Sequence, residues 1–431
     1  MTPEIEKASP ETIKTFQEEK LKETISYVAE HSPYYKRLFA NHHIDPTRIV
    51  SLEDLKRIPT TSKADIQKHN DDFICVPKEQ LIDYVTTSGT LGDPVTFALT
   101  DKDLERLAYN EAISFACSGV SPKHVIQLMT TIDRRFMAGL AYFLGARKLG
   151  AGIIRVGAGV PELQWDSILK FKPDYLIAVP SFLLKLIDYA KAHGIDLNSC
   201  SVKGVICIGE PVRHEDFSLN TLSKKITAQW SIKLYSTYAS TEMNTAFAEC
   251  EAQKGGHHHP ELIIIEILDD NDQEVPEGEV GELTITTLGV EGMPLLRFKT
   301  GDMLQAHRQP CSCGRTTLRL GPVVGRKNHM IKYKGTTLYP QAMYNALNGF
   351  AEIENYQIEV STNTLGTDEI LIRIAVQKES EELQYAIKDH IRAKLRVTPK
   401  LEFIDPEILQ KLQLPEGQRK PILLVDKRRS M

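Results

Sequence analysis

The sequence predicts an α/β protein whose large N-terminal domain has mainly parallel sheets flanked by helices, followed by a smaller α+β domain. Three observations support this. The chain has 431 residues, which is too long for one compact core. Short apolar segments alternate with helical ones from residue 125 onward, as in βαβ units. The pattern then changes at about residues 262 and 325. We therefore expect an N-terminal domain over 1–325, with a β-rich unit at about 250–320, and a C-terminal domain over 326–431.

The N-terminal domain begins with helices and loops, because apolar residues recur at helical spacing over residues 11–31. The strands predicted for the parallel sheet are residues 125–129, 152–156, 175–179, 205–208 and 232–235. Helical segments separate them, and the clearest is the amphipathic stretch 181–193, which stops at Gly194. Short, continuously apolar strands of this kind predict a sheet covered by helices on both faces.

The later elements differ in texture. Strands at 262–268 and 281–287 flank an acidic turn at 269–272 and a Pro-Glu-Gly turn, which predicts the β-rich unit. The last hundred residues predict strands at 356–360, 370–376 and 400–404 and a helix over 381–395. This mixture predicts a small α+β domain.

The composition excludes several classes of protein. Hydrophobic residues make up 42% of the chain and charged residues 25%, as in ordinary globular proteins. A formal net charge of −5 gives no support for a nucleic-acid or membrane partner. The most apolar region, 136–160, is interrupted by Arg147, Lys148 and Arg155 and does not predict a membrane span. Seven cysteines without a visible secretory signal predict a cytoplasmic protein with reduced thiols or a metal site. A homodimer is one arrangement that the sequence allows.

A loop rich in hydroxyls and glycine follows a short apolar run near residue 85. Its central residues are Thr87, Ser88, Gly89 and Thr90. Backbone N–H groups and hydroxyls in such a loop can surround a phosphate, since glycine permits close approach. The loop lacks the Gly-Lys-Ser/Thr of a P-loop, so it brings no lysine of its own. A polar turn between strands is the alternative interpretation.

Further polar segments stand in a fixed order after this loop. They are Gly209-Glu210-Pro211, Tyr238-Ala239-Ser240-Thr241-Glu242, Asp302 and Gly325-Arg326. The first two follow predicted parallel strands, and ligands of open α/β sheets collect at the carboxyl ends of the strands. Taken singly, Glu242 is a solvated acid, Tyr238 a packing residue and Asp302 an acid after a turn.

The cysteines form a second constellation. Cys311 and Cys313 have the spacing of a metal knuckle, and Cys250 and His257 offer two more ligands. One imidazole and three thiolates suit a closed tetrahedral Zn²⁺ site with a structural role. His258 and His259 leave the choice of histidine open, and reduced surface cysteines are the alternative.

The ordered set resembles the adenylate-forming superfamily of acyl-CoA synthetases, and within it the phenylacetate-CoA ligases. The matching motifs are Thr87-Ser88-Gly89-Thr90, Tyr238-x-x-Thr241-Glu242, Met293-Pro294-Leu295-Leu296-Arg297 and Cys311-Ser312-Cys313-Gly314-Arg315. The resemblance spans about residues 84 to 340, and a family-like C-terminal domain follows. It implies an AMP-forming ligase that joins an aryl or small carboxylic acid to coenzyme A through an acyl-adenylate. It also implies that the C-terminal domain is mobile and rotates between the two half-reactions.

The resemblance implies a role for each motif. Thr87, Ser88, Gly89 and Thr90 would hold the β/γ-phosphates of ATP, and Glu242 would bind Mg²⁺. Tyr238 would stack on adenine. Thr241 would contact the α-phosphate and, with Glu242, would be catalytic. The full set of other expected ATP/AMP contacts is Gly209, Glu210, Pro211, Tyr238, Ala239, Ser240, Thr241, Asp302 and Arg326. Phe136 and Ile208 would line the acyl pocket, and His329, Lys334 and Gly335 the hinge and the coenzyme A side. The Gly-x-His pattern of the relatives favours His257, with Cys250, Cys311 and Cys313, as the Zn²⁺ ligands.

Two departures from the family pattern bear on these roles. The hinge position, usually Asp or Lys, is His329. Gln418 stands where the family's C-terminal lysine is expected, and Lys420 is our candidate to replace that catalytic lysine. Two alternative functions follow: an adenylate-forming enzyme that passes its acyl group to a carrier protein or amine, and a non-catalytic, zinc-stabilised nucleotide-binding protein.

Overall fold

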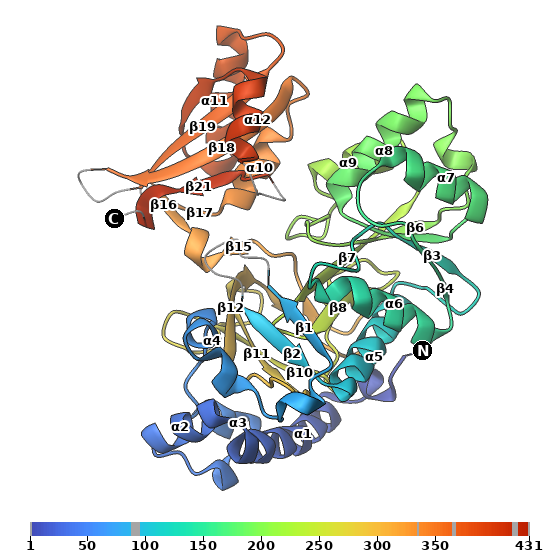
Figure 1. Ribbon diagram of the computed structural model, residues 1–431. Coiled ribbons are helices and arrows are strands. Elements are labelled where there is room, and N and C mark those ends of the chain that lie inside the picture. Colours follow the sequence, from blue (N-terminus) through green and yellow to red (C-terminus); the bar gives the residue numbers. More distant parts are fainter. Residues whose placement is uncertain (1, 88–94, 334–335, 364–367, 416–420, 430–431) are drawn as a thin grey trace. The chain divides into compact units, whose positions relative to one another are not determined.

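The computed structural model describes residues 2–87, 95–333, 336–363, 368–415 and 421–429. The chain divides into two compact units (Figure 1). Unit 1 comprises Met1–Thr300 and Leu304–Pro322, and unit 2 comprises Gly301–Met303 and Val323–Met431. In the described parts of the chain, no helix combines the length and the apolar character needed to cross a membrane.

Unit 1 opens with helices that are set by their caps. The helices are α1 (Pro10–His31), α2 (Pro33–Asn41), α3 (Leu52–Leu55) and α4 (Lys63–His69). The Ser9 side chain accepts from the Thr12 N–H at the start of α1, and Ser32 accepts from Tyr35 at the start of α2. A proline follows each serine, at the first helical position, where proline is favoured because its missing N–H would have no partner in the helix. A hairpin of β1 (Asp83–Thr86) and β2 (Thr96–Leu99) then flanks the hydroxyl-rich loop.

The main sheet of unit 1 has nine strands in the order β13-β14-β9-β8-β7-β6-β5-β3-β4. Its parallel half comprises β3 (Val125–Leu128), β4 (Gly152–Arg155), β5 (Tyr175–Ala178), β6 (Gly204–Cys207) and the start of β7 (Lys233–Ser240). Helix α5 (Asp101–Cys117) precedes these strands. The helices between them are α6 (Met137–Leu149), α7 (Pro161–Phe171), α8 (Pro180–Ala192) and α9 (Thr221–Thr227).

Both faces of the inner strands β5 and β6 of this parallel half are buried by helices, whereas the edge strand β4 is partly exposed (Figure 1). Leu176 and Ala178 of β5 pack in the cluster that holds Trp165 of α7 and Leu183 of α8. The alternate residues of β5, Tyr175 and Ile177, pack in the cluster of α5 and α6. A strand buried on both faces must be apolar throughout, which explains the continuous apolar runs in the sequence.

The antiparallel half of the sheet continues from β7. It contains β8 (Thr245–Glu249), β9 (Gly256–His257), β13 (Ala306–His307) and β14 (Arg319–Leu320). The β-rich unit adds a hairpin of β10 (Ile263–Leu268) and β11 (Gly281–Thr287), followed by β12 (Phe298–Leu304).

Unit 2 begins with a short pairing of β12 and β15 (Gly325–Arg326), followed by a hairpin of β16 (Ile331–Tyr333) and β17 (Thr336–Leu338). Its sheet has the order β20-β19-β18-β21, formed by β18 (Ile353–Thr362), β19 (Asp368–Val376), β20 (Lys400–Phe403) and β21 (Leu424–Asp426). The helices are α10 (Pro340–Leu347), α11 (Glu381–Leu395) and α12 (Pro406–Gln413). Ile387 and Ile391 of α11 pack on Ile358 and Ile372 of the sheet.

The predicted fold class is confirmed: a mixed α/β structure with a large sheet flanked by helices and a smaller α+β unit. Two strands are much longer than predicted: β18 spans Ile353–Thr362 instead of 356–360, and β7 runs on to Ser240 instead of ending near Tyr235. The β7 extension is stabilised by antiparallel pairing with β8, which a local apolar pattern cannot indicate.

Candidate active site

A four-residue turn between β7 and β8 carries the central motif. Ser240 pairs with Thr245, so residues 241–244 form the turn. Thr241 and Glu242 are half-buried in this turn, and Asn244 has a left-handed backbone with φ of 50°. The turn thus presents a hydroxyl and a carboxylate at the end of a strand.

Tyr238 lies three residues before the turn, within β7. It pairs across the hairpin with Phe247, and the two rings stack with centroids 6.0 Å apart. One side of the Tyr238 ring is therefore supported by another aromatic ring. Such support holds a ring flat, as a stacking platform for a base requires.

The Gly209–Pro211 segment follows β6 and turns sharply. Gly209 has φ of 75°, a conformation that favours glycine. The Glu210 carboxylate accepts hydrogen bonds from the N–H and the Oγ of Ser181, each at 2.8 Å, at the start of α8. The Glu210 carboxylate already caps α8. A ligand would therefore bind the main chain of this segment more readily than the carboxylate.

The expected acyl-pocket residues occupy different environments. Ile208 is buried beside the parallel sheet, whereas Phe136 is 36% exposed at the start of α6. Arg134 and Arg135, which precede Phe136, both have left-handed backbones. The Arg135 carbonyl accepts from the Thr86 N–H at 3.0 Å, so the segment before Phe136 lies against the end of β1.

Only the first residue of the hydroxyl-rich motif lies in the described structure. The Thr87 Oγ accepts from the Val95 N–H at 3.1 Å, and the Thr87 N–H donates to the Val95 carbonyl at 3.0 Å. These bonds close the base of the loop. The predicted residues Ser88, Gly89, Thr90, Lys334, Gly335 and Lys420 lie outside the described residues, as does Gln418.

Asp302 and Arg326 are paired within unit 2. They lie opposite each other on β12 and β15, and the Arg326 Nε is 3.1 Å from the Asp302 Oδ1. The Asp302 carboxylate is buried, whereas the Arg326 side chain is 43% exposed. His329 lies three residues further on, in a short 3₁₀ helix over Lys327–His329.

The four predicted metal ligands converge at one edge of the main sheet. Cys250 follows β8, His257 lies in β9, and Cys311 and Cys313 lie between β13 and β14. The Sγ atoms of Cys250 and Cys311 are 3.6 Å apart. The His257 Nε2 lies 3.4 Å from the Cys250 Sγ and 3.5 Å from the Cys313 Sγ. All four ligand atoms lie within 4.8 Å of one another.

These separations fit a tetrahedral metal. Zn–S bonds of about 2.3 Å and Zn–N bonds of about 2.0 Å place two sulfurs about 3.8 Å apart and a sulfur and a nitrogen about 3.5 Å apart. A disulfide would instead need sulfurs about 2.05 Å apart. The donor set, three thiols and one imidazole, is the one that structural Zn²⁺ prefers. His258 and His259 do not join the cluster, since His258 contacts the Ile263 carbonyl and His259 contacts Glu6.

Groups around the cluster orient its members. The His257 Nδ1 lies 3.4 Å from the Thr317 Oγ1. Arg315 donates from Nη1 to the Cys313 Sγ at 3.5 Å and from Nε to the buried Glu6 Oε2 at 2.5 Å. Glu6 also pairs with the His259 Nδ1 at 2.5 Å, so the first short helix, Glu4–Lys7, is held against the cluster.

The ionisation of the cluster follows from burial and from Arg315. Burial, with the charge of Arg315, lowers the pKa of His257 to about 3, so the imidazole is neutral and able to bind a metal. Burial raises the pKa of Cys250 to about 12. Burial also opposes ionisation of Cys313, but hydrogen bonds from the Arg315 backbone and side chain outweigh it and lower the pKa of that thiol.

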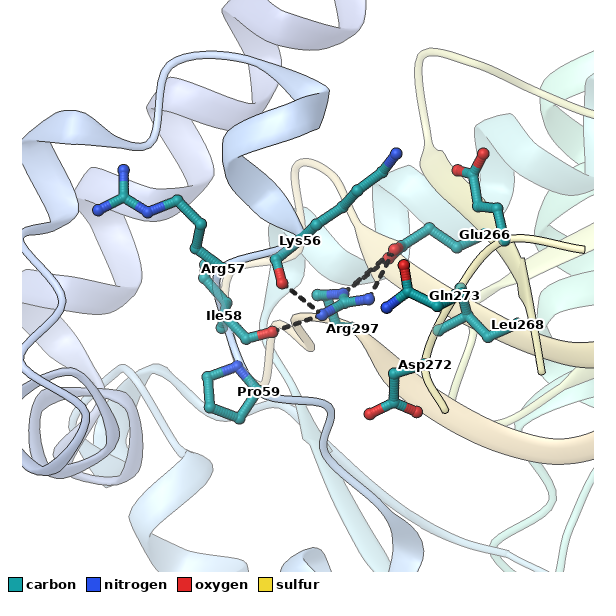
Figure 2. A pocket seen from close by; sticks show the side chains of 10 residues that line it. Lys56, Arg57, Ile58, Pro59, Glu266, Leu268, Asp272, Gln273 and Arg297 are labelled. Atoms are coloured by element: carbon teal, nitrogen blue, oxygen red, sulfur yellow. Dashed lines mark hydrogen bonds and ion pairs between the residues drawn. The ribbon is translucent and has the colours of Figure 1, made fainter. Parts of the chain in front are cut away.

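Arg297, the last residue of the Met-Pro-Leu-Leu-Arg motif, lies in a cavity of about 240 Å³ (Figure 2). Its guanidinium donates to both oxygens of Glu266 and to the carbonyls of Lys56 and Ile58. Figure 2 shows these bonds joining the segment after α3, at Lys56 and Ile58, to Glu266 of the β-rich unit. Because protein groups already satisfy this charge, Arg297 has a structural role here.

Two more buried arginines, which no sequence motif indicated, bind the strands or the turn of the β7–β8 hairpin. Arg213 pairs with Glu249 at 2.7 Å and also donates to the Leu234 carbonyl. Arg106 of α5 donates to main-chain groups beside the turn at residues 241–244. Charged and polar residues surround Arg106 in the sequence of α5 as well as apolar ones, and its acceptors are mostly carbonyls, so no local pattern marked it.

Comparison with known proteins agrees with this architecture. A model of the AMP-binding enzyme family matches residues 11–292, and a model of the AMP-binding enzyme C-terminal domain matches residues 335–428. Phenylacetate-coenzyme A ligase of Thermus thermophilus is 31% identical over 90% of this chain and 87% of its own length. The enzyme of the same name from Escherichia coli is 28% identical, over 91% and 89%.

Solved structures show the same fold. 2-Hydroxyisobutyryl-CoA ligase in complex with 2-HIB-AMP has a TM-score of 0.81 at 22% identity, covering 96% of this chain and 89% of that one. Anthranilate CoA ligase with anthranoyl-AMP has a TM-score of 0.57 at 16% identity, covering 77% and 64%. With the family models and relatives above, these findings lead to one assignment. The chain belongs to the AMP-binding enzyme family and is an adenylate-forming acid–thiol ligase of the phenylacetate-CoA ligase type.

Proposed function

We propose that this chain activates an aryl or small carboxylic acid with ATP and transfers the acyl group to coenzyme A. The observation that carries the proposal is the turn at residues 241–244, which holds Thr241 and Glu242 beyond the stacked pair of Tyr238 and Phe247. In a family member, this arrangement puts a base platform, a hydroxyl and a carboxylate on one hairpin. The relatives named above are phenylacetate-coenzyme A ligases, which supports the reaction class.

The reaction needs two displacements. An oxygen of the acid attacks the α-phosphorus of ATP, the bond to the bridging oxygen breaks, and pyrophosphate leaves. The thiolate of coenzyme A then attacks the acyl carbon, the bond to the phosphate oxygen breaks, and AMP leaves. The first displacement joins two anions, so positioning and charge neutralisation should dominate catalysis.

We assign the following residues to the nucleotide. Tyr238 would stack on adenine, Thr241 would contact the α-phosphate, and the main chain of residues 209–211 and 239–240 would line the nucleotide. Asp302 would accept from the ribose hydroxyls and is oriented by Arg326. Hydroxyl and N–H groups of residues 87–90 would hold the terminal phosphates.

The half-buried Glu242 carboxylate offers the hard oxygen ligand that Mg²⁺ prefers, so we assign it to that ion. Bound there, Mg²⁺ would neutralise phosphate charge. Lys420 would supply the remaining positive charge at the phosphates. His329, Lys334 and Gly335 would form the hinge and the side of the site that binds coenzyme A. The C-terminal domain would rotate about this hinge between the two half-reactions.

The acid is proposed to be an aryl or small carboxylic acid. Ile208 is buried, and a methylene-sized change in a pocket shifts selectivity by about 1–3 kcal/mol. Phe136, exposed at the start of α6, would supply an aromatic surface for the acyl group. These two residues favour a flat or short acid without selecting phenylacetate.

We propose that Cys250, His257, Cys311 and Cys313 bind a structural Zn²⁺. The separations of their ligand atoms and the soft donor set support this ion. Four protein ligands leave no position for a substrate, so the role is to stabilise the β8–β9 and β13–β14 connections. The free cysteines also fit a reducing, cytoplasmic setting.

The deciding experiment follows pyrophosphate release from ATP over a panel of aryl and short-chain acids. We expect acid-dependent release, ATP–pyrophosphate exchange and, with coenzyme A present, a thioester product. Release without consumption of coenzyme A would favour transfer to a carrier protein or amine. If neither ATP nor AMP binds, the proposal is wrong.

A further inference from the structure

Helix α5 contains a buried arginine whose hydrogen bonds all go to neutral acceptors in the described structure. The Arg106 Nε donates to the Leu288 carbonyl at 2.8 Å, and Nη1 donates to the Asn244 carbonyl at 2.5 Å. Nη2 donates to the Leu262 carbonyl at 2.5 Å and to the Thr245 Oγ1 at 3.2 Å. A buried charge of this kind is costly unless every bond is made, so its position is tightly determined.

The four acceptors come from three separate segments. Asn244 and Thr245 close the turn that carries Thr241 and Glu242. Leu262 and Leu288 flank the β10–β11 hairpin, and the Leu288 N–H donates to the Leu262 carbonyl at 2.9 Å. Arg106 therefore joins the turn to the rigid base of the β-rich unit.

Local bonds hold the turn only in part: the Ser240 Oγ accepts from the Met243 N–H at 3.3 Å, but the Asn244 side chain adds no bond in the described structure. Asn244 adopts φ of 50°, and its buried side-chain amide has neither its oxygen nor its nitrogen hydrogen-bonded in the described structure. Asparagine tolerates this conformation, but an unpaired buried amide is unfavourable. One helical turn beyond Arg106, the Asn110 Oδ1 accepts from the Ala246 N–H at 3.0 Å. Helix α5 thus holds the hairpin at two successive points.

We propose that Arg106 is a positioning residue that holds the Glu242 carboxylate in place for Mg²⁺·ATP. The proposal rests on the function proposed above and adds a residue to it. Arginine is required because its planar fork reaches acceptors in three directions, whereas a lysine ammonium offers three donors from a single nitrogen. Arg106 itself contacts no reacting atom.

The test compares Arg106→Lys with Arg297→Lys in the full chain. Arg297 is another buried arginine, which bonds Glu266 and two carbonyls elsewhere in unit 1, so its variant controls for a general loss of stability. Hydrogen exchange of residues 240–246 reports on the turn without any assay of activity. ATP–pyrophosphate exchange over a Mg²⁺ titration reports on adenylation, and thioester formation from supplied acyl-adenylate reports on the second half-reaction.

We expect Arg106→Lys to lose protection at residues 240–246 and to need about tenfold more Mg²⁺ for half-maximal exchange, the effect of one lost charged hydrogen bond. Its thioester formation from acyl-adenylate should stay within about twofold of wild type, and Arg297→Lys should change neither protection nor Mg²⁺ dependence. Unchanged protection and Mg²⁺ dependence in Arg106→Lys, or equal changes in both variants, would overturn the inference while leaving the proposed function intact. A wild-type chain without acid-dependent exchange would overturn both.

Discussion

The cysteine cluster and the turn at residues 241–244 are built in opposite ways. The cluster brings four protein ligands within 4.8 Å of one another and surrounds them with orienting groups. The turn presents the half-buried Glu242 carboxylate, its last residue Asn244 has a left-handed backbone, and Arg106 anchors it from α5. A complete set of protein ligands suits a structural role, whereas an incomplete set leaves room for substrate. Stability and catalysis should therefore separate between these two regions.

The largest expected effect is on stability, from Cys311→Ser. Loss of one thiolate should release the metal, and metal binding by zinc peptides is worth about 10–16 kcal/mol. If about 5 kcal/mol of that is lost here, the melting temperature of unit 1 should fall by about 5–10 °C, given its size. Calorimetry with zinc analysis measures this, with Cys200→Ser, outside the cluster, as the control. Full stability and zinc content in Cys311→Ser would contradict the structural role.

Glu242→Gln should have the opposite profile. Adenylation should fall about 10²–10³-fold, as when one group that stabilises charge in a transition state is removed. The melting temperature should change little, because this half-exposed turn position contributes little packing. ATP–pyrophosphate exchange measures the first effect, with the exposed Glu162→Gln as a control. Equal rates in the two variants would remove Glu242 from the site.

Glu111 tests burial without a partner of opposite charge. Burial raises the pKa of this α5 carboxyl to about 8, although a hydrogen bond from Asn110 opposes the shift. The folded state therefore binds a proton that the unfolded state releases above pH about 4.5. Stability from this group is fully present below that pH and is lost as the pH rises toward 8.

Glu111→Gln should remove this slope and make the chain more stable at pH 8, by about 1 kcal/mol or more. Urea unfolding at pH 5 and pH 8 measures the difference. The wild type and the variant losing equal stability over this range would show that Glu111 is not the titrating group.

The smallest expected effect distinguishes two substitutions of Asn244. Asn244→Gly should fold at least as well as wild type, since glycine accepts φ of 50° and removes an unpaired amide. Asn244→Ala keeps the strain and should be about 1 kcal/mol less stable than the glycine variant. Chemical denaturation gives the order, and an alanine variant of equal stability would show that the turn is not strained.

Local patterns predicted much of the fold. The helix expected over residues 381–395 is α11, and the helical spacing of 11–31 corresponds to α1, which begins one residue earlier because Ser9 caps it. The extension of β7 was missed, because pairing with β8 lies outside its own sequence.

The site was predicted as a set of motifs but not as a set of contacts. The spacing of the cysteines and the family resemblance predicted Cys250, His257, Cys311 and Cys313 as ligands, and the structure brings their ligand atoms together. The anchors Arg106 and Arg213 were missed, because their acceptors are mostly backbone carbonyls, which every residue carries. The side-chain role of Glu210 as a helix cap also depends on a partner 29 residues away.

The contact between Glu6 and Arg315 has a consequence for synthesis of the chain. These buried groups are 309 residues apart in sequence, so the first helix cannot reach its final environment until Arg315 has left the ribosome. At about 5–20 residues per second, this interval is roughly 15–60 s. During that time the Glu6 carboxylate, which is fully buried and doubly paired in the finished fold, must remain hydrated. The Glu6 charge that later pairs with Arg315 thus also favours hydration of the nascent N-terminal segment until that pairing forms.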